Sequence, residues 1–195
     1  TRLEHDIYRR IEPSELLNQA WSKEKLRHRS PHVLQSTTRF NNISNWVACQ
    51  IVFPESLKIR IARWTKFINI AKQVFMLNNF NTSLAIISGM QNAGVHRLKF
   101  TRDGLDKRTV EDYEFLMQKM SSDRAYRGYR DHILSCSPPC TPYLGIYLTD
   151  LTFVEDGNPD FIKSKRTGRD LINWTKRRFV HNVISEIQTY QHKPY

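Results

Sequence analysis

Three carboxylates crowd the second half of one short predicted helix, and their type and spacing make them the first candidates for chemistry. Asp150, Glu155 and Asp156 follow an apolar run, 143–148, that should be buried on every face. Carboxylate oxygens suit Mg²⁺ or Ca²⁺, but no partner carboxylate stands out elsewhere. A carboxylate in a last turn faces the negative end of the helix dipole, which is unfavourable by ~0.3–1 kcal/mol. The spacing alone favours solvated turn residues. However, carboxylates at the unfavourable end of the dipole, at the tip of an anchored helix, indicate a functional site.

The residues around this run set both ends of the predicted helix, which spans 142–156. Thr141 can act as the N-cap, because its hydroxyl accepts a hydrogen bond from a free backbone N–H, and Pro142 suits the first helical position. Gly157 can supply a left-handed C-terminal residue, and Pro159 prevents the helix from resuming. The sequence therefore predicts a short helix with a buried base and an acidic tip.

Signatures of covalent or cofactor chemistry are missing from the sequence. There is no nucleophile elbow, no G-x-x-x-x-G-K-[ST] phosphate loop and no G-x-G-x-x-G motif. His132, Cys136 and Cys140 could superficially serve as metal ligands, but no fourth ligand follows at a recognisable spacing. We therefore expect no cofactor and no bound metal, and a protein that acts by binding.

The chain carries a formal net charge of +11 over 195 residues, which indicates nucleic acid, an anionic membrane surface or an acidic protein as partner. The basic residues are dispersed, with clusters at 23–29, 163–166 and 176–178, and no nucleic-acid-binding signature accompanies them. Solvated helix faces are therefore a better interpretation than a nucleic-acid groove. Three cysteines form no disulfide framework, so a reducing, cytoplasmic setting fits best.

Helical periodicity dominates and predicts a single all-α domain. Apolar residues on one predicted helix face recur at alternating steps of four and three: Leu57, Ile61, Trp64, Ile68, Ala71 and Phe75. A second series comprises Phe179, Val183, Ile187 and Tyr190. Further helices should begin at 12–17, at 41–48 and after a break at 78–81. The longest loops are expected at 22–32, 97–108 and 157–168, and strand patterns of useful length are absent.

Several sequence blocks together carry a specific resemblance. They are R-F-N-N-I-S-N-W-V (39–47), L-N-N-F-N (77–81), V-H-R-L (95–98), the helical segment 138–159 and Y-Q-H-K-P-Y (190–195). In order and spacing, the chain resembles the catalytic domain of Ras-family guanine-nucleotide exchange factors. The resemblance covers residues 1–195, slightly truncated at both ends: the chain begins just inside the family's usual first helix and stops where the family continues into another.

The resemblance implies an all-α bowl with a protruding helical hairpin at about 142–178. The segment 142–156 would be the first arm. The second arm should start near 168–171 and run through Trp174 towards Arg178. In the family, the hairpin opens the first switch region of the GTPase while the bowl remodels the second.

The resemblance also implies roles for three residues of the hairpin. Asp156 falls where the family places an acidic residue aimed at the vacated phosphate region, where a carboxylate competes for phosphate-binding donors. Thr152 occupies the position of a larger apolar residue that obstructs Mg²⁺ in some members, and a threonine obstructs less. Thr149 shares its face and would bond to the switch backbone.

A second set of residues is implied to bind the GTPase. Tyr143, Tyr126 and the pair His96 and Arg97 match positions that cup an aromatic residue of the second switch, and Asn158 completes the set. On pattern alone, ordinary core packing is the favoured interpretation of Tyr143 and Tyr126.

The expected function is acceleration of GDP release from a Ras-like small GTPase, by binding and without a covalent step. A non-catalytic GTPase-binding scaffold of the same fold is the alternative, and specific nucleic-acid binding is a weaker one. We expect a cytoplasmic monomer that acts at the inner membrane surface, with peripheral association with anionic membrane.

Overall fold

The computed structural model describes residues 1–195, and helices account for nearly all of its regular structure. The helices are α1 (Arg2–Arg9), α2 (Pro31–Val52), α3 (Leu57–Met76), α4 (Phe80–Met90), α5 (Ala93–His96), α6 (Lys99–Asp103), α7 (Lys107–Lys119), α8 (Asp123–Leu134), α9 (Leu144–Gly157) and α10 (Trp174–Thr189), with 3₁₀ turns at Pro13–Leu16 and Glu24–Arg29. Two short strands, β1 (Phe161–Lys163) and β2 (Asp170–Ile172), pair antiparallel. The predicted all-α class is confirmed.

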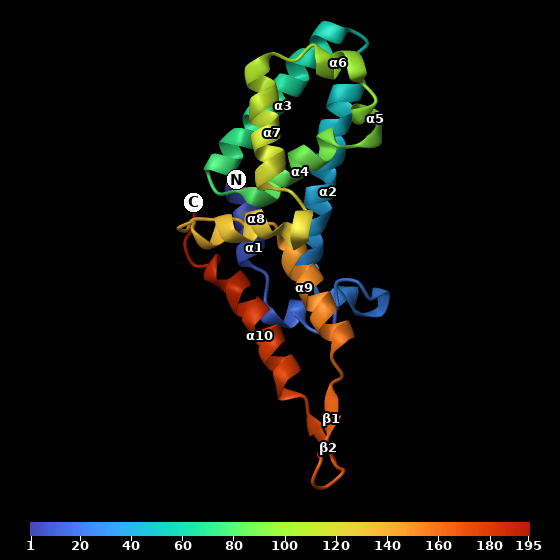
Figure 1. Cartoon of the computed structure of the whole chain (residues 1–195), viewed down its shortest axis with the longest axis vertical. Helices are drawn as coiled ribbons and strands as arrows, with labels where there is room; N and C mark the ends of the chain where they lie inside the picture. Colours follow the sequence, from blue (N-terminus) through green and yellow to red (C-terminus); the bar gives the residue numbers. More distant parts are fainter.

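The molecule is elongated, with a helical body at one end and a hairpin at the other (Figure 1). Helices α2 to α8 form the body, and α9 and α10 form two arms that are joined at their far end by the β1–β2 ribbon. No helix in the chain combines the length and the apolar character that crossing a membrane requires.

Helix α4 lies at the centre of the body and packs against both α2 and α3. A Cβ on Gly89 would meet the Ser44 carbonyl oxygen at 2.4 Å, so this glycine allows α4 to approach α2 closely. The periodic face of α3 contributes Trp64, Ile68 and other buried side chains to the core, as its spacing predicted, although Leu57 remains exposed.

A buried carboxylate joins three helices of the body. Glu4 of α1 accepts hydrogen bonds from Arg39 Nε of α2 and from Asn81 Nδ2 of α4, each at 2.6 Å. Because both carboxylate oxygens are satisfied, the buried charge is compensated.

The two ends of the chain are joined side by side (Figure 1). His5 Nε2 lies 3.1 Å from the Lys193 carbonyl oxygen, and Arg9 Nε donates to the carbonyl of Gln191 at 2.8 Å. The amide of Gln191 donates in turn to the carbonyls of Tyr8 and Ile11. The last residues therefore hold α1 in place.

The hairpin helix begins two residues later and ends one residue later than predicted. Helix α9 begins at Leu144, because the backbone of Thr141 is already paired: its N–H donates to the Asn78 carbonyl and its own carbonyl accepts from Phe80 N–H. Gly157 is not left-handed, since the chain leaves α9 through an extended Asn158. The side-chain amide of Asn158 instead bonds the Val154 carbonyl at 3.0 Å, which caps the helix end.

Two further helix starts differ from the expectation. Helix α2 begins at Pro31 rather than at 41–48, because Pro31 provides a favourable first helical residue ten positions earlier. The second arm does not start at 168–171, where β2 forms. Helix α10 begins at Trp174 with Asn173 as its N-cap, which accepts from Lys176 N–H at 3.3 Å, and extends well beyond Arg178.

The predicted loops contain short elements that the sequence pattern did not reveal. The 3₁₀ turn Glu24–Arg29 lies in the first, α6 in the second and β1 in the third. On α10, the buried apolar residues are Val180, Ile184 and Ile187, so Phe179, which is exposed, does not belong to the core-facing series.

Candidate functional site

Helix α9 is firmly anchored along its base. Leu144, Ile146 and Tyr147 are buried as predicted, and Leu151 is buried as well, whereas Tyr143 and Leu148 are only half-buried. The Tyr147 hydroxyl donates to Glu186 of α10 at 3.1 Å. On the other side, Asp150 accepts two hydrogen bonds from the guanidinium of Arg130 in α8, both at 2.8 Å. Asp150 is thus a structural ion-pair partner, and α9 is fixed to both of its neighbours.

An aromatic pocket lies at the N-terminal end of α9. The Tyr143 ring is 5.3 Å from the Phe40 ring and 6.1 Å from the Tyr126 ring. Burial raises the pKa of Tyr143, so its hydroxyl stays neutral. The cavity beside these rings has a volume of about 220 Å³ and is lined by Phe40, Leu84, Ile87, Ser88, Gln91, Met117, Met120, Ser121, Ser122, Tyr126 and Tyr143.

Local backbone conformation positions both tyrosines. The Tyr143 N–H donates to the buried Tyr129 hydroxyl at 2.9 Å. Tyr126 follows Arg124 and Ala125, and all three have φ between 50° and 62°. Consecutive left-handed non-glycine residues are strained, and such strain is concentrated at functional sites. The strained turn therefore supports a binding role for the pocket. The family resemblance implied Tyr126 and Tyr143, whereas Phe40 was not among the expected residues.

The structure does not bring His96 and Arg97 into this pocket. Both are exposed at the end of α5, where His96 Nε2 lies 3.5 Å from an Arg102 nitrogen. They share no lining position with Tyr126 and Tyr143. A role for His96 and Arg97 in GTPase binding therefore requires contact with a part of the GTPase outside this pocket.

The two threonines of α9 bond to their own helix. Thr149 donates its hydroxyl proton to the Gly145 carbonyl at 2.8 Å, and Thr152 donates to the Leu148 carbonyl at 2.9 Å. Thr149 is exposed and Thr152 is half-buried. With their protons engaged in the helix, both oxygens remain available as hydrogen-bond acceptors.

Asp156 is tethered by a residue that sequence reasoning missed. The side-chain amide of Gln19 donates to Asp156 Oδ1 at 2.8 Å and reaches the Thr152 carbonyl at 3.5 Å. Gln19 lies in the segment before α2 and has a φ of 53°. No sequence signal links two residues so far apart. Asp156 is exposed, and its second oxygen, Oδ2, makes no hydrogen bond within the chain.

A buried lysine compensates the acidic end of α9. Lys176 of α10 is only 3% exposed, and its ammonium lies 2.7 Å from Glu155 Oε2 and 3.1 Å from Asp160 Oδ1. It also donates to the Glu155 carbonyl at 3.2 Å, so it satisfies one of the last carbonyls of α9. Glu155 is thus not a solvated turn residue. Lys176 belongs to the basic cluster 176–178, which the charge pattern alone predicted to lie on a solvated helix face.

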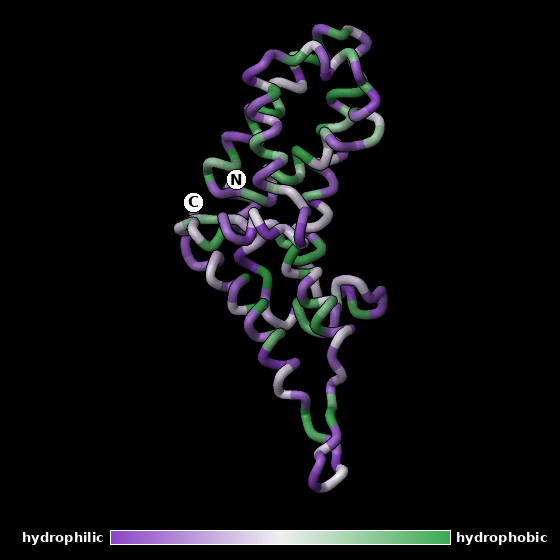
Figure 2. Tube along the Cα trace, in the orientation of Figure 1, coloured by the Kyte–Doolittle hydropathy of each residue, from purple (hydrophilic) through white to green (hydrophobic).

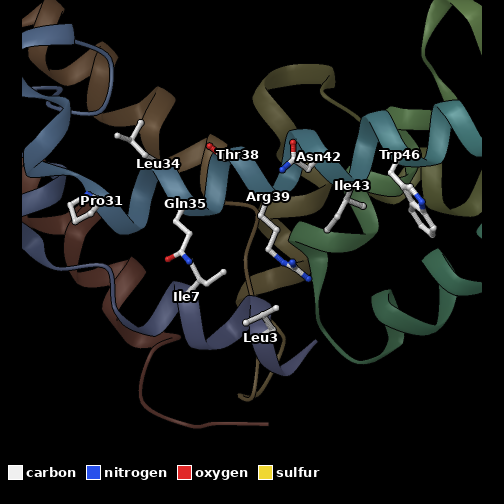
Figure 3. Close-up of a pocket in the computed structure, with 10 residues that line it drawn as sticks. All are labelled: Leu3, Ile7, Pro31, Leu34, Gln35, Thr38, Arg39, Asn42, Ile43 and Trp46. Carbon is white, nitrogen blue, oxygen red and sulfur yellow. The ribbon is translucent and has the colours of Figure 1, made fainter.

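A separate apolar groove runs between α1 and α2 (Figure 3). Its volume is about 590 Å³, and its lining residues are Leu3, Ile7, Pro31, Leu34, Gln35, Thr38, Arg39, Asn42, Ile43 and Trp46. It has no lining residue in common with the aromatic pocket. The side chain of Arg39 reaches across the groove towards α1 (Figure 3), where it pairs with Glu4.

The cysteines and histidines do not gather into a metal site. Cys136 Sγ lies 3.8 Å from His132 Nε2, and Cys140 is buried. No group of three or more His, Cys, Asp or Glu side chains is placed to hold a metal ion.

The family model described as the RasGEF domain matches residues 1–178, which include the aromatic pocket and both arms of the hairpin up to the first turns of α10. The chain belongs to the RasGEF family. The resemblance of the motif blocks to Ras-family exchange factors is thereby confirmed.

Curated relatives of this RasGEF domain match over its whole length. Ras guanine nucleotide exchange factors J and I of Dictyostelium discoideum are each 47% identical over 196 residues, which cover 100% of this chain and 23% of the relative. Human Ras-specific guanine nucleotide-releasing factor 1 is 34% identical over 195 residues, which cover 15% of that protein. The chain thus spans at most about a quarter of the length of these relatives.

Proposed function

We propose that this RasGEF domain accelerates GDP release from a Ras-like small GTPase, and that it does so by binding, without covalent chemistry or a cofactor. The observation that carries the proposal is the family match over residues 1–178. Two features support it: a pocket of aromatic side chains beside α9, and a helix α9 whose base is fixed while its C-terminal half exposes Phe153 and Asp156.

The aromatic pocket is the proposed receptor for an aromatic side chain of the second switch region. Tyr126, Tyr143 and Phe40 are among the residues that line this cavity of about 220 Å³, which suits one inserted ring. Such an anchor in a pocket is typical of binding hot spots. His96 and Arg97 would contact another part of the same GTPase.

Helix α9 is the proposed wedge against the first switch. Thr149 and Thr152 would accept hydrogen bonds from switch N–H groups, because their protons are engaged within the helix. The free Oδ2 of Asp156 would accept from donors that otherwise hold phosphate. Asn158 donates its side-chain nitrogen to the helix end, so its Oδ1 would be the atom that contacts the GTPase.

Thermodynamic linkage between domain binding and nucleotide binding explains how binding alone promotes nucleotide exchange. The factor by which the domain lowers nucleotide affinity is the factor by which nucleotide lowers affinity for the domain. Abundant free nucleotide then displaces the domain, which sets the rate of switching but not its direction. The net charge of +11 supports association with an acidic GTPase surface and with an anionic membrane rather than with specific nucleic acid. We propose a monomer that works in the cytoplasm at the inner membrane surface.

Release of a fluorescent GDP analogue from preloaded Ras, Rap and Ral proteins tests the proposal. In excess unlabelled nucleotide, addition of the domain should accelerate release from at least one of them. No acceleration from any of the three would reject it. Stable binding to nucleotide-free GTPase without faster release would instead establish the scaffold alternative.

A further inference from the structure

The β1–β2 ribbon exposes apolar side chains on both of its faces. Phe161 pairs with Ile172, and Ile162 pairs with Leu171. Directly paired residues share a face, and successive residues point to opposite faces. The four side chains are 60%, 59%, 45% and 49% exposed, in that order. An ordinary antiparallel sheet turns a polar face to water. This ribbon differs because each of its two faces carries exposed apolar side chains.

Cations cap the same ribbon at its turn. Lys163 is paired with Asp170 at 2.8 Å, which leaves Lys165, Arg166 and Arg169 without a carboxylate partner. Figure 2 shows hydrophobic strands followed by a largely hydrophilic turn. At the other end of the ribbon, Trp174 is 75% exposed. The segment thus combines an apolar ribbon with basic side chains and an exposed indole.

The ribbon is held outward from the domain. The side chain of Asn173 donates to the Pro159 carbonyl at 2.9 Å, and its N–H donates to the Asp160 carbonyl at 2.9 Å. Arg177 pairs with Asp160 at 2.7 Å. The ribbon forms the far end of the hairpin, away from α4 and α8, which line the aromatic pocket (Figure 1).

We infer that the β1–β2 ribbon, residues 161–172 with Trp174, is a membrane-binding element that inserts into the interfacial region of an anionic lipid bilayer. A bilayer surrounds both faces of an inserted ribbon, whereas a globular protein partner covers only one. Three residues per strand span about 10 Å, which matches the roughly 5–10 Å depth of interfacial insertion. Long basic side chains extend from an inserted apolar segment to lipid phosphates, and tryptophan favours the interface.

This inference deepens the proposal that the domain works at an anionic membrane, but its test needs no GTPase. Flotation with vesicles of phosphatidylcholine, with and without phosphatidylserine, measures lipid binding of the 195-residue chain. We expect binding only to vesicles that contain phosphatidylserine, with a blue shift of tryptophan emission. The shift should be largely lost in Trp174→Phe, because the remaining tryptophans lie outside the ribbon.

Two ribbon variants separate the apolar and the ionic contributions. The apolar variant, F161T/I162T/L171T/I172T, places β-branched side chains at all four strand positions and should weaken vesicle binding at least about tenfold, since many buried methylene groups are lost. The charge variant, K165E/R166E/R169E, should weaken binding to anionic vesicles by a similar factor or more. Thermal unfolding and exchange on a soluble GTPase should be unchanged in both.

Control variants carry changes of the same two kinds elsewhere on the surface. F100T/L134T removes two exposed apolar side chains of the body, and K25E/R27E/R29E reverses three charges of the Glu24–Arg29 turn. Both should bind vesicles like the parent. Equal binding by the parent and the apolar variant, or equal loss in the charge control, would overturn the inference in favour of a general electrostatic bias. Loss of exchange on soluble GTPase in the ribbon variants would overturn it in favour of a protein-binding ribbon.

Discussion

The ammonium of Lys176 lies 2.7 Å from Glu155 Oε2, so a cation of one hairpin arm is buried against the last turn of the other. The glutamate stands at the negative end of the α9 dipole, and the lysine supplies the positive charge that this end favours. The same ammonium reaches Asp160, which begins the segment leading to the ribbon. One ion-pair cluster therefore joins both arms to the segment that leads to the ribbon.

Replacing this cation should destabilise the domain. Lys176→Met leaves the partly buried Glu155 without its partner, and we expect a loss of about 2 kcal/mol in the free energy of unfolding, below the full effect of a buried pair because Asp160 is half exposed. Urea unfolding measures this. The double variant with Glu155→Gln should recover part of the loss. Lys107→Met, which removes an exposed pair with Glu111, is the matched control and should change stability by under about 1 kcal/mol. Equal effects of the two lysine variants would contradict the assigned role.

The contribution of this cluster should depend on pH at both extremes. Burial acts to lower the pKa of Lys176, but hydrogen bonds to Glu155 and Asp160 outweigh it and raise the pKa above its usual 10.5. The hydrogen bond from Lys176 lowers the pKa of Asp160 below its usual 3.8. The raised pKa of Lys176 contributes stability below pH 10.5, and this contribution is lost as the pH rises through the pKa of the folded state. The lowered pKa of Asp160 contributes stability above pH 3.8, and this contribution is lost as the pH falls through the pKa of the folded state. The stability difference between parent and Lys176→Met should therefore be constant at intermediate pH and shrink at either end. A difference that grows at high pH would contradict the pairing.

Mild acid should weaken the junction of the chain ends. Burial lowers the pKa of His5 from its usual 6.5, so the neutral ring is favoured in the folded state. Stability is then full above pH 6.5 and falls as the pH drops through the lowered value. Unfolding measured between neutral and mildly acidic pH should show a shallower decline for His5→Asn than for the parent. Some decline should remain, because burial also lowers the pKa of His132. If stability declines equally with falling pH in parent and variant, folding does not lower the pKa of His5.

Loss of the Tyr143 ring should weaken association with the GTPase. Tyr143→Ala removes one wall of the aromatic pocket, and we expect a loss of about 2 kcal/mol in binding to nucleotide-free GTPase, as for an aromatic hot spot. Titration by fluorescence anisotropy measures it. The control Tyr143→Phe keeps the ring and should bind like the parent, because the Tyr143 hydroxyl makes no hydrogen bond within the chain. If the alanine variant binds normally while remaining folded, Tyr143 is an ordinary packing residue.

Asp156 should act at a different step. Asp156→Ala should leave the fold intact, since it relieves an unfavourable dipole contact, and should lower the maximal release rate with little effect on association. A plot of nucleotide release rate against domain concentration separates an effect on the maximal rate from an effect on association. Asp156→Asn can still accept from Gln19 but lacks the charge, so an equally slow asparagine variant assigns the effect to the carboxylate. Gln19→Ala tests whether the tether matters. A folded alanine variant that matches the parent at saturation would leave Asp156 as a solvated turn residue.

Periodicity was sufficient to predict the helices that pack by a regular face. The spacing of Trp64, Ile68 and Ala71 identified the core side of α3, because burial repeats with the helical turn. The predicted break at 78–81 overlaps the observed one, although α4 already begins at Phe80: Asn78 is left-handed, with a φ of 58°, and Asn79 caps α4. These features depend on neighbours in sequence, which is why a sequence pattern contains them.

Features that depend on distant partners were not predictable in the same way. Thr141 satisfied the local rules for an N-cap, but a bridge to Asn79 from another part of the chain takes its backbone. The tether from Gln19 to Asp156 joins residues 137 positions apart. The strands of the ribbon are three residues long, too short for alternation to be recognised. The resemblance supplied the hairpin and most of the candidate site, whereas Phe40, Gln19 and Lys176 required the structure.

The junction of the two chain ends has a mechanical consequence. Tension applied through the termini would first load the hydrogen bonds between α1 and the last residues, such as Arg9 to the Gln191 carbonyl. Helix α9 and the ribbon lie outside this short path between the ends (Figure 1). Pulling by flanking segments would therefore leave α9 and the ribbon unstretched until the C-terminal residues detach from α1.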